Sequence, residues 1–106
     1  LLENIDKAFS RRFNYKIEFK KPNIEQRIEL WQMMLPVDAP YAQDINIPLL
    51  AKYSLTGGQI NIIVKNTAYK VAVSEKPIFH QKDFIDEINR EKDANFDSEK
   101  SMGFLK

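Results

Sequence analysis

Two arginines and two glycines are the residues of this sequence whose types and spacing suit chemistry on a phosphorylated ligand. Arg11 and Arg12 are adjacent, and the planar guanidinium groups of such a pair can donate paired hydrogen bonds to phosphate oxygens and stabilise phosphoryl transfer. Gly57 and Gly58 open a helical pattern, where missing side chains let a ligand approach the backbone N–H groups. Each pair also has a structural interpretation: the arginines as solvated cations at a helix end, the glycines as part of a turn.

Other reactive groups are scarce. The sequence has no cysteine, which excludes a disulfide framework, a thiolate zinc site and a thiol nucleophile. His80 is the single histidine, and we expect a surface histidine and no metal site. No Gly-x-x-x-x-Gly-Lys-Ser/Thr loop occurs, so the chain carries no triphosphate-binding loop and we expect no hydrolysis by this chain alone.

Composition limits the class of protein. The 106 residues, 43% hydrophobic and 29% charged, fit one globular domain with a trailing segment. Sixteen basic against fifteen acidic residues leave a formal charge of +1, which argues against a dedicated nucleic-acid module. Apolar runs are short, as in residues 62–64, so no membrane span is expected and we predict a cytoplasmic protein.

The N-terminal part predicts a short helix over about residues 5–10 and one strand over about 15–20. Alternating apolar and charged residues, from Tyr15 to Lys20, give the strand one wet face, and Pro22 ends it. A lone strand leaves its backbone groups unpaired. We therefore expect its sheet to lie outside this chain or to be completed by self-association.

Helical spacing dominates after Pro22. It predicts helices over about 24–35, 46–54, 56–74 and 82–91, with capping residues at Asn23, Asn46 and Thr56. From residue 93 onward the pattern fades, and we expect a polar, mobile tail. The predicted fold is mainly α, with about four helices. The apolar faces expected for the three longer helices comprise Ile24, Ile28, Leu30, Trp31, Met34, Leu35, Ile60, Ile63, Val64, Ala68, Val71, Ala72, Phe84, Ile85 and Ile88.

Four segments, in this order, resemble the part of an AAA+ ATPase that follows the sensor 1 strand. They are residues 4–13 (NIDKAFSRRF), residues 17–22 with the strand that ends in proline, residues 27–31 (RIELW) and residues 55–60 (LTGGQI), the last similar to the sensor 2 region. The resemblance covers about residues 4–90. It implies that residues 1–21 end a large α/β nucleotide-binding domain, that 22–92 form the helical lid, and that 93–106 form the tail.

The resemblance also implies site residues. Arg12 matches the position of an arginine finger that acts on the neighbouring subunit, and Arg11 is the second candidate. Leu30 and Met34 match lid positions near the adenine, and the glycine pair matches the turn over the nucleotide. Gln59 stands where many members carry Asp, and no sensor 2 arginine is evident.

The implied function is a contribution to ATP binding and hydrolysis in a homo-oligomeric ring, usually a hexamer. ATP would be held with Mg²⁺ bound by an upstream part of a longer protein, and a client protein is expected without being identified. Two alternatives stay open. One is a non-enzymatic helical interaction domain, and the other a nucleic-acid binder that uses the basic stretch over residues 1–21.

Overall fold

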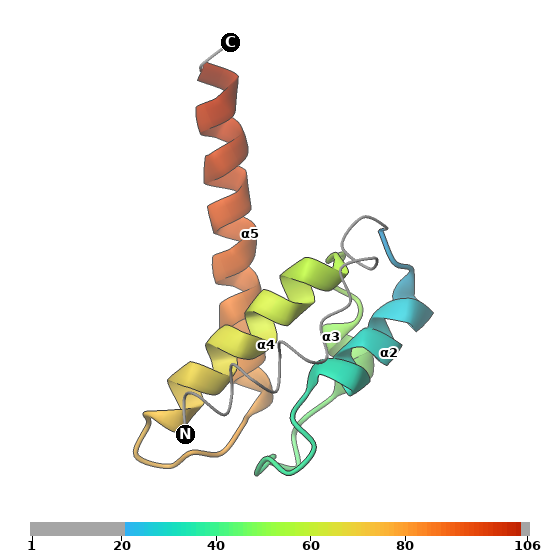
Figure 1. Cartoon of the computed structure of the whole chain (residues 1–106), viewed down its shortest axis with the longest axis vertical. Helices are drawn as coiled ribbons and strands as arrows, with labels where there is room; N and C mark the ends of the chain where they lie inside the picture. Colours follow the sequence, from blue (N-terminus) through green and yellow to red (C-terminus); the bar gives the residue numbers. More distant parts are fainter. Residues whose placement is uncertain (1–20, 105–106) are drawn as a thin grey trace.

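The structure, a computed structural model, describes residues 21–104 and is mainly helical there, as the sequence predicts. Its helices are α2 (Ile24–Met34), α3 (Ile47–Leu50), α4 (Gly57–Ala72) and α5 (Gln81–Phe104) (Figure 1). The only β-structure in this range is one parallel bridge between Tyr41 and Phe79. The helix expected over 5–10 and the strand expected over 15–20 lie outside the described residues.

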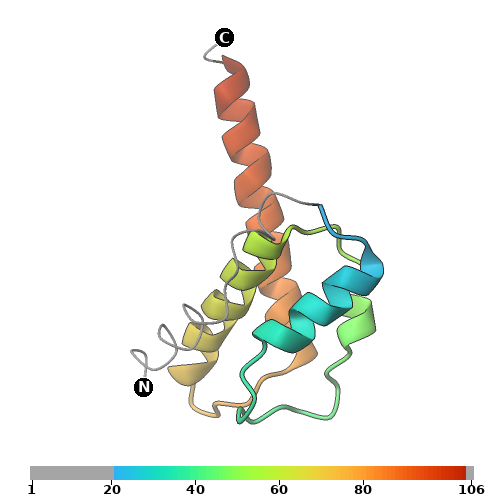
Figure 2. The same cartoon turned by 45° about the vertical axis from the view of Figure 1, so that its right-hand side comes forward.

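Helix α4 is the centre of the domain. Both α2 and α5 pack against α4, and α3 packs against α2 (Figures 1 and 2). The helix buries the face that its apolar spacing predicts, together with one polar residue, Thr67, whose hydroxyl donates to the carbonyl oxygen of Ile63 at 2.7 Å. Its buried side chains belong to a single core cluster shared with α2 and α5.

Helix α2 buries most of the expected face, with Ile24 as the exception and Arg27 as an addition. Asn23 caps it in a reciprocal box with Gln26, as predicted. The buried side chains are Arg27, Leu30, Trp31 and Met34, whereas Ile24 is 48% exposed. The expectation for Ile24 is wrong: Ile24 lies on nearly the same side of the helix as Trp31, but it is the first residue of α2 and is exposed there.

Aromatic rings connect the core to the loops. The Trp31 ring meets Phe84 of α5 edge to face at 5.9 Å between centroids, and Phe84 stacks on Phe79 at 5.5 Å. The ring of Phe79 in turn lies 5.2 Å from that of Tyr41, so the residues of the β-bridge also pack through their side chains. Such pairs stabilise beyond the area they bury, by roughly 0.5–1.5 kcal/mol each.

Two helix lengths depart from expectation. Helix α3 ends at Leu50 rather than near residue 54, since the chain turns there and the Tyr53 N–H donates to the Leu50 carbonyl at 3.2 Å. Helix α5 does not end near residue 91 but continues to Phe104, because no proline and no glycine interrupts it before Gly103. Its second half extends beyond the other helices (Figure 1). That residues 93–106 are mobile stays a prediction.

None of the helices within residues 21–104 is at once long enough and apolar enough to cross a membrane.

Candidate functional site

The start of α4 carries the predicted glycine pair. Thr56 is the N-cap; its hydroxyl accepts the Gln59 N–H at 3.1 Å, while the Gln59 side chain accepts the Thr56 N–H at 2.9 Å. This capping box satisfies the third helical N–H. Gly57 and Gly58 occupy the first two helical positions, where an α-helix provides no acceptor of its own for the backbone N–H groups.

Backbone conformation does not explain these glycines. No glycine in the described part of the chain has a positive φ, so both positions accept any residue on backbone grounds. Glycine in a helix is less stable than alanine by roughly 0.5–1 kcal/mol. Gly57 is buried, which gives packing as a reason for its missing side chain, whereas Gly58 is only partly buried. At Gly58 the reason must be sought in something that approaches the helix start closely.

Asn61 lies one turn beyond Gly57 on the same face of α4. Its Oδ1 atom is buried and has no hydrogen-bond partner in the described structure. A buried, unsatisfied amide oxygen is unfavourable by roughly 1–3 kcal/mol, so it calls for an explanation.

The other predicted site residues are either buried in the core or outside the described residues. Leu30 is 5% exposed and Met34 is fully buried, and both belong to the core cluster that includes Ile60 of α4. As the domain is folded, neither side chain offers surface to a ligand. Arg11 and Arg12 lie outside the described residues, so their role stays a prediction.

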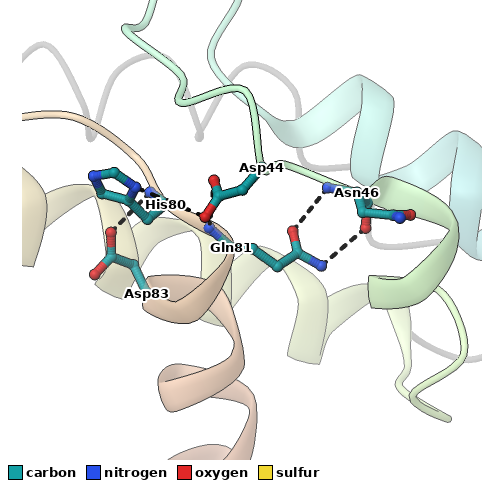
Figure 3. Close-up of polar contacts among 5 residues, drawn as sticks. All are labelled: Asp44, Asn46, His80, Gln81 and Asp83. Carbon is teal, nitrogen blue, oxygen red and sulfur yellow. Dashed lines mark hydrogen bonds and ion pairs between the residues drawn. The ribbon is translucent and has the colours of Figure 1, made fainter.

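A second polar cluster holds the start of α5 (Figure 3). The Gln81 N–H donates to Asp44 Oδ1 at 3.3 Å, and the His80 N–H donates to Asp83 Oδ2 at 2.9 Å. The Gln81 carboxamide accepts from the Asn46 N–H at 2.8 Å and donates to the Asn46 carbonyl at 3.0 Å. Residues from the loop before α3 therefore cap α5, and the start of α5 anchors the start of α3.

His80 lies at the surface of this cluster, as the sequence predicts. Its side chain is 54% exposed, and its Nδ1 atom is 3.8 Å from Asp44 Oδ2. Among the side chains that the structure describes, within residues 21–94, no group of three or more histidine and carboxylate residues is arranged to hold a metal ion. The hydrogen bonds of the cluster connect the loop before α3 to the start of α5.

Sequence reasoning missed two buried charged residues. Glu87 is 4% exposed, with Lys70 Nζ at 3.8 Å and Arg90 Nη1 at 3.9 Å from its Oε2 atom. Arg27 is 7% exposed and donates to two backbone carbonyl groups. Spacing was the available signal, because Glu87 stands three residues after buried Phe84.

One carboxyl near the middle of α5 has a shifted pKa. Burial raises the pKa of the Glu91 carboxyl above its usual value. The next residue, Lys92, holds its Nζ atom 5.7 Å from the centre of the Tyr53 ring, so this part of α5 lies beside the segment that leads into α4.

Comparison with protein-family models, with curated proteins and with solved structures gave no match to this chain. The function must therefore be inferred from the sequence patterns and the geometry of the site.

Proposed function

We propose that this chain is the lid, with the end of the preceding large domain, of an AAA+ ATPase, and that the start of α4 lies against bound ATP. The observation that carries the proposal is the glycine pair: both residues have ordinary helical conformation, and Gly58 is partly exposed at the second position of the helix. A Cβ atom at that position would fill the space that a nucleotide needs to reach the backbone.

The chemistry of the helix start fits a nucleotide. The first N–H groups of a helix and its dipole favour negatively charged groups. Asn61 Oδ1 is an acceptor without a partner among the described residues, and because the atom is buried it would have to become exposed to meet a donor such as the amino group of adenine. Because Leu30 and Met34 are buried, we assign them to the packing beneath the site, and contact with adenine would require them to become exposed.

The rest of the machinery follows from the resemblance. Arg12, with Arg11 as the second candidate, would act as a finger toward the nucleotide of a neighbouring subunit in a homo-oligomeric ring. The phosphate-binding loop and the ligands of Mg²⁺ would come from another segment, because this sequence has no such loop. Such a protein would work in the cytoplasm on a protein client.

ATP binding by the chain itself is the direct test. Titration of the ¹⁵N-labelled 106-residue chain with ATP should shift the amide resonances of Gly57, Gly58 and Asn61, with weak affinity and no phosphate release. Changes spread over the surface, or no changes at millimolar ATP, would argue against a site at the α4 start.

Gly58→Val sharpens the test in the intact ATPase. It should weaken ATP binding by crowding the ligand while α4 stays formed, because valine fits the helical backbone there. Glu25→Val is the matched control, since Glu25 is exposed at the same position of α2. Equal ATP affinity in both variants, measured by calorimetry, would leave the glycine pair with a structural role only.

The assignment of Arg12 as an arginine finger predicts different effects on ATP affinity and on ATP hydrolysis. Arg12→Ala should leave ATP affinity nearly unchanged and reduce hydrolysis by on the order of 10³, as for other trans-acting arginine fingers. Arg12→Lys should restore little, because an ammonium group lacks the planar fork that spans two phosphate oxygens. Wild-type hydrolysis by Arg12→Ala would transfer the role to Arg11 or remove it.

A further inference from the structure

Arg27 is a buried cation held only by backbone carbonyl groups among the described residues. Its Nε atom donates to the Ala51 carbonyl oxygen at 2.7 Å, and its Nη1 atom donates to the Pro22 carbonyl oxygen at 2.6 Å. No ion pair in the described part of the chain includes it. A buried charge is stable only when its N–H groups donate to good acceptors. Both of these short hydrogen bonds are therefore required to keep the Arg27 guanidinium group buried.

The two acceptors belong to different parts of the chain. Ala51 is the C-cap of α3, and Pro22 is the residue through which the chain enters the helical domain. One planar guanidinium group on α2 therefore holds the end of α3 and the point of entry at the same time. Because the fork of an arginine is rigid, it fixes the position of one carbonyl group relative to the other.

The point of entry is also fixed by its neighbours. Pro22 is buried and has its φ angle set by its ring. Asn23 is held by the reciprocal bonds with Gln26, at 2.9 Å and 2.8 Å. Lys21, the residue before, is exposed. The rigid part of the domain thus begins at Pro22.

From these contacts we infer that Arg27 is a positioning residue that fixes the direction in which the chain enters the helical domain. Any hinge between this domain and the preceding part of the protein then lies before Pro22. The kinetic consequence of this positioning rests on the proposed function. In the proposed ATPase the nucleotide lies between the large domain and the lid. Because α2 packs on α4, the joint that Arg27 fixes at Pro22 would transmit a displacement of α4 to the preceding domain.

The joint is tested first in the 106-residue chain, without reference to activity. The Pro22 carbonyl and the Asn23 N–H share one peptide plane, so ¹⁵N relaxation of Asn23 reports its mobility. All variants are compared in a Gln26→Ala background, which removes the bond from the Asn23 N–H. There we expect an order parameter of about 0.85 with Arg27 present and below about 0.6 in Arg27→Gln. Arg27→Lys keeps the charge and the aliphatic stem but can reach one carbonyl at most, and should fall between the two. Arg90→Gln, at a 78% exposed position, is the matched control and should resemble the wild type.

An Asn23 amide that stays as rigid in Arg27→Lys as in the wild type would overturn the inference. This variant also decides the matter if Arg27→Gln fails to fold.

The second test uses the intact ATPase. Arg27→Lys should lower kcat about tenfold and leave the KM for ATP nearly unchanged, because the nucleotide contacts at the α4 start remain. A merely structural role would lower the melting temperature and leave kcat unchanged well below it, and that result would refute the coupling. Absence of ATPase activity in the wild type would refute the proposed function alone, since the order parameters still decide the joint.

Discussion

The starts of α4 and α5 satisfy their backbone groups in different ways. At α5, residues distant in sequence take part: Asp44 accepts the first helical N–H, and the Gln81 side chain pairs with Asn46 (Figure 3). At α4 the capping is entirely local, between Thr56 and Gln59, and the first two positions are glycines. The α5 start is closed by tertiary contacts, whereas at the α4 start the capping bonds within residues 21–104 are those between Thr56 and Gln59.

This difference separates a structural helix start from one available to a ligand. A start capped by a distant loop contributes to the stability of the fold and has no room for a further partner. At Gly58, which is neither fully buried nor at a positive φ, glycine gives up stability relative to alanine without a gain in the fold itself. Such local inconsistency is typical of functional positions.

Adding a side chain at Gly57, the buried position of the α4 start, should have the largest effect on the free energy of unfolding. Gly57→Val places a branched side chain in a packed site, and overpacking of this kind destabilises by about 2 kcal/mol. Urea unfolding measures the loss. Gly58→Ala is the control and should be stabilising by about 0.5 kcal/mol, because its backbone needs no glycine. Equal stability of the two variants would contradict the distinction between the positions.

Removing the side-chain contacts of Gln81 at the start of α5 should have the next largest effect on the free energy of unfolding. Gln81→Ala removes both bonds to Asn46 and should destabilise by about 1.5 kcal/mol, with faster hydrogen exchange at α3 as well as at α5. Gln43→Ala, at an exposed position of the same loop, should change neither. Loss of protection at α5 alone would show that the cluster does not connect the two helices.

Removing the local cap of α4 should have a smaller and more confined effect. Thr56→Ala loses the bond from the Gln59 N–H and should destabilise by about 1 kcal/mol, or roughly 4–8 °C in melting temperature. Exchange should increase only in the first turn of α4. Thr56→Ser keeps the hydroxyl and should retain most of the stability; faster exchange at α3 or α5 would mean that the α4 start is not independent.

The smallest effect is expected beyond the α5 start, at Glu91. Burial raises the pKa of its carboxyl in the folded state, so folding favours the protonated form, and the stability this gives is lost as pH rises through the folded pKa. Glu91→Gln should therefore raise the melting temperature slightly at pH 7 and not at pH 4, below the usual value of 4.5. An effect of equal size at both pH values would rule out ionisation as the cause.

Much of the fold could be predicted because local signals agree with one another. The capping boxes at Asn23 and Thr56 and the apolar spacing of α4 placed two helices almost to the residue. The α5 boundary failed, since fading hydrophobicity marks the end of burial and not the end of a helix without proline. The burial of Arg27 and Glu87 was not predicted, because it depends on partners distant in sequence, the Ala51 carbonyl and Lys70.

The candidate site was predictable in part. Residue type and spacing indicated the glycine pair as a candidate site. Only the backbone conformation excludes a turn that requires glycine, because neither residue has a positive φ. The partnerless Asn61 oxygen and the two carbonyl partners of Arg27 depend on three-dimensional neighbours, which no pattern along the chain contains.

The Tyr41–Phe79 bridge has a consequence for the order of folding. It lies beside the Asp44–Gln81 bond, which joins residues 37 apart in the sequence, so this region forms only after a long loop has closed. Contacts between α4 and α5, which follow one another in the chain, require a much shorter search. We therefore expect the α4–α5 hairpin in the folding nucleus and the bridge region on its native side, so that Gln81→Ala accelerates unfolding in stopped-flow experiments and leaves the folding rate nearly unchanged.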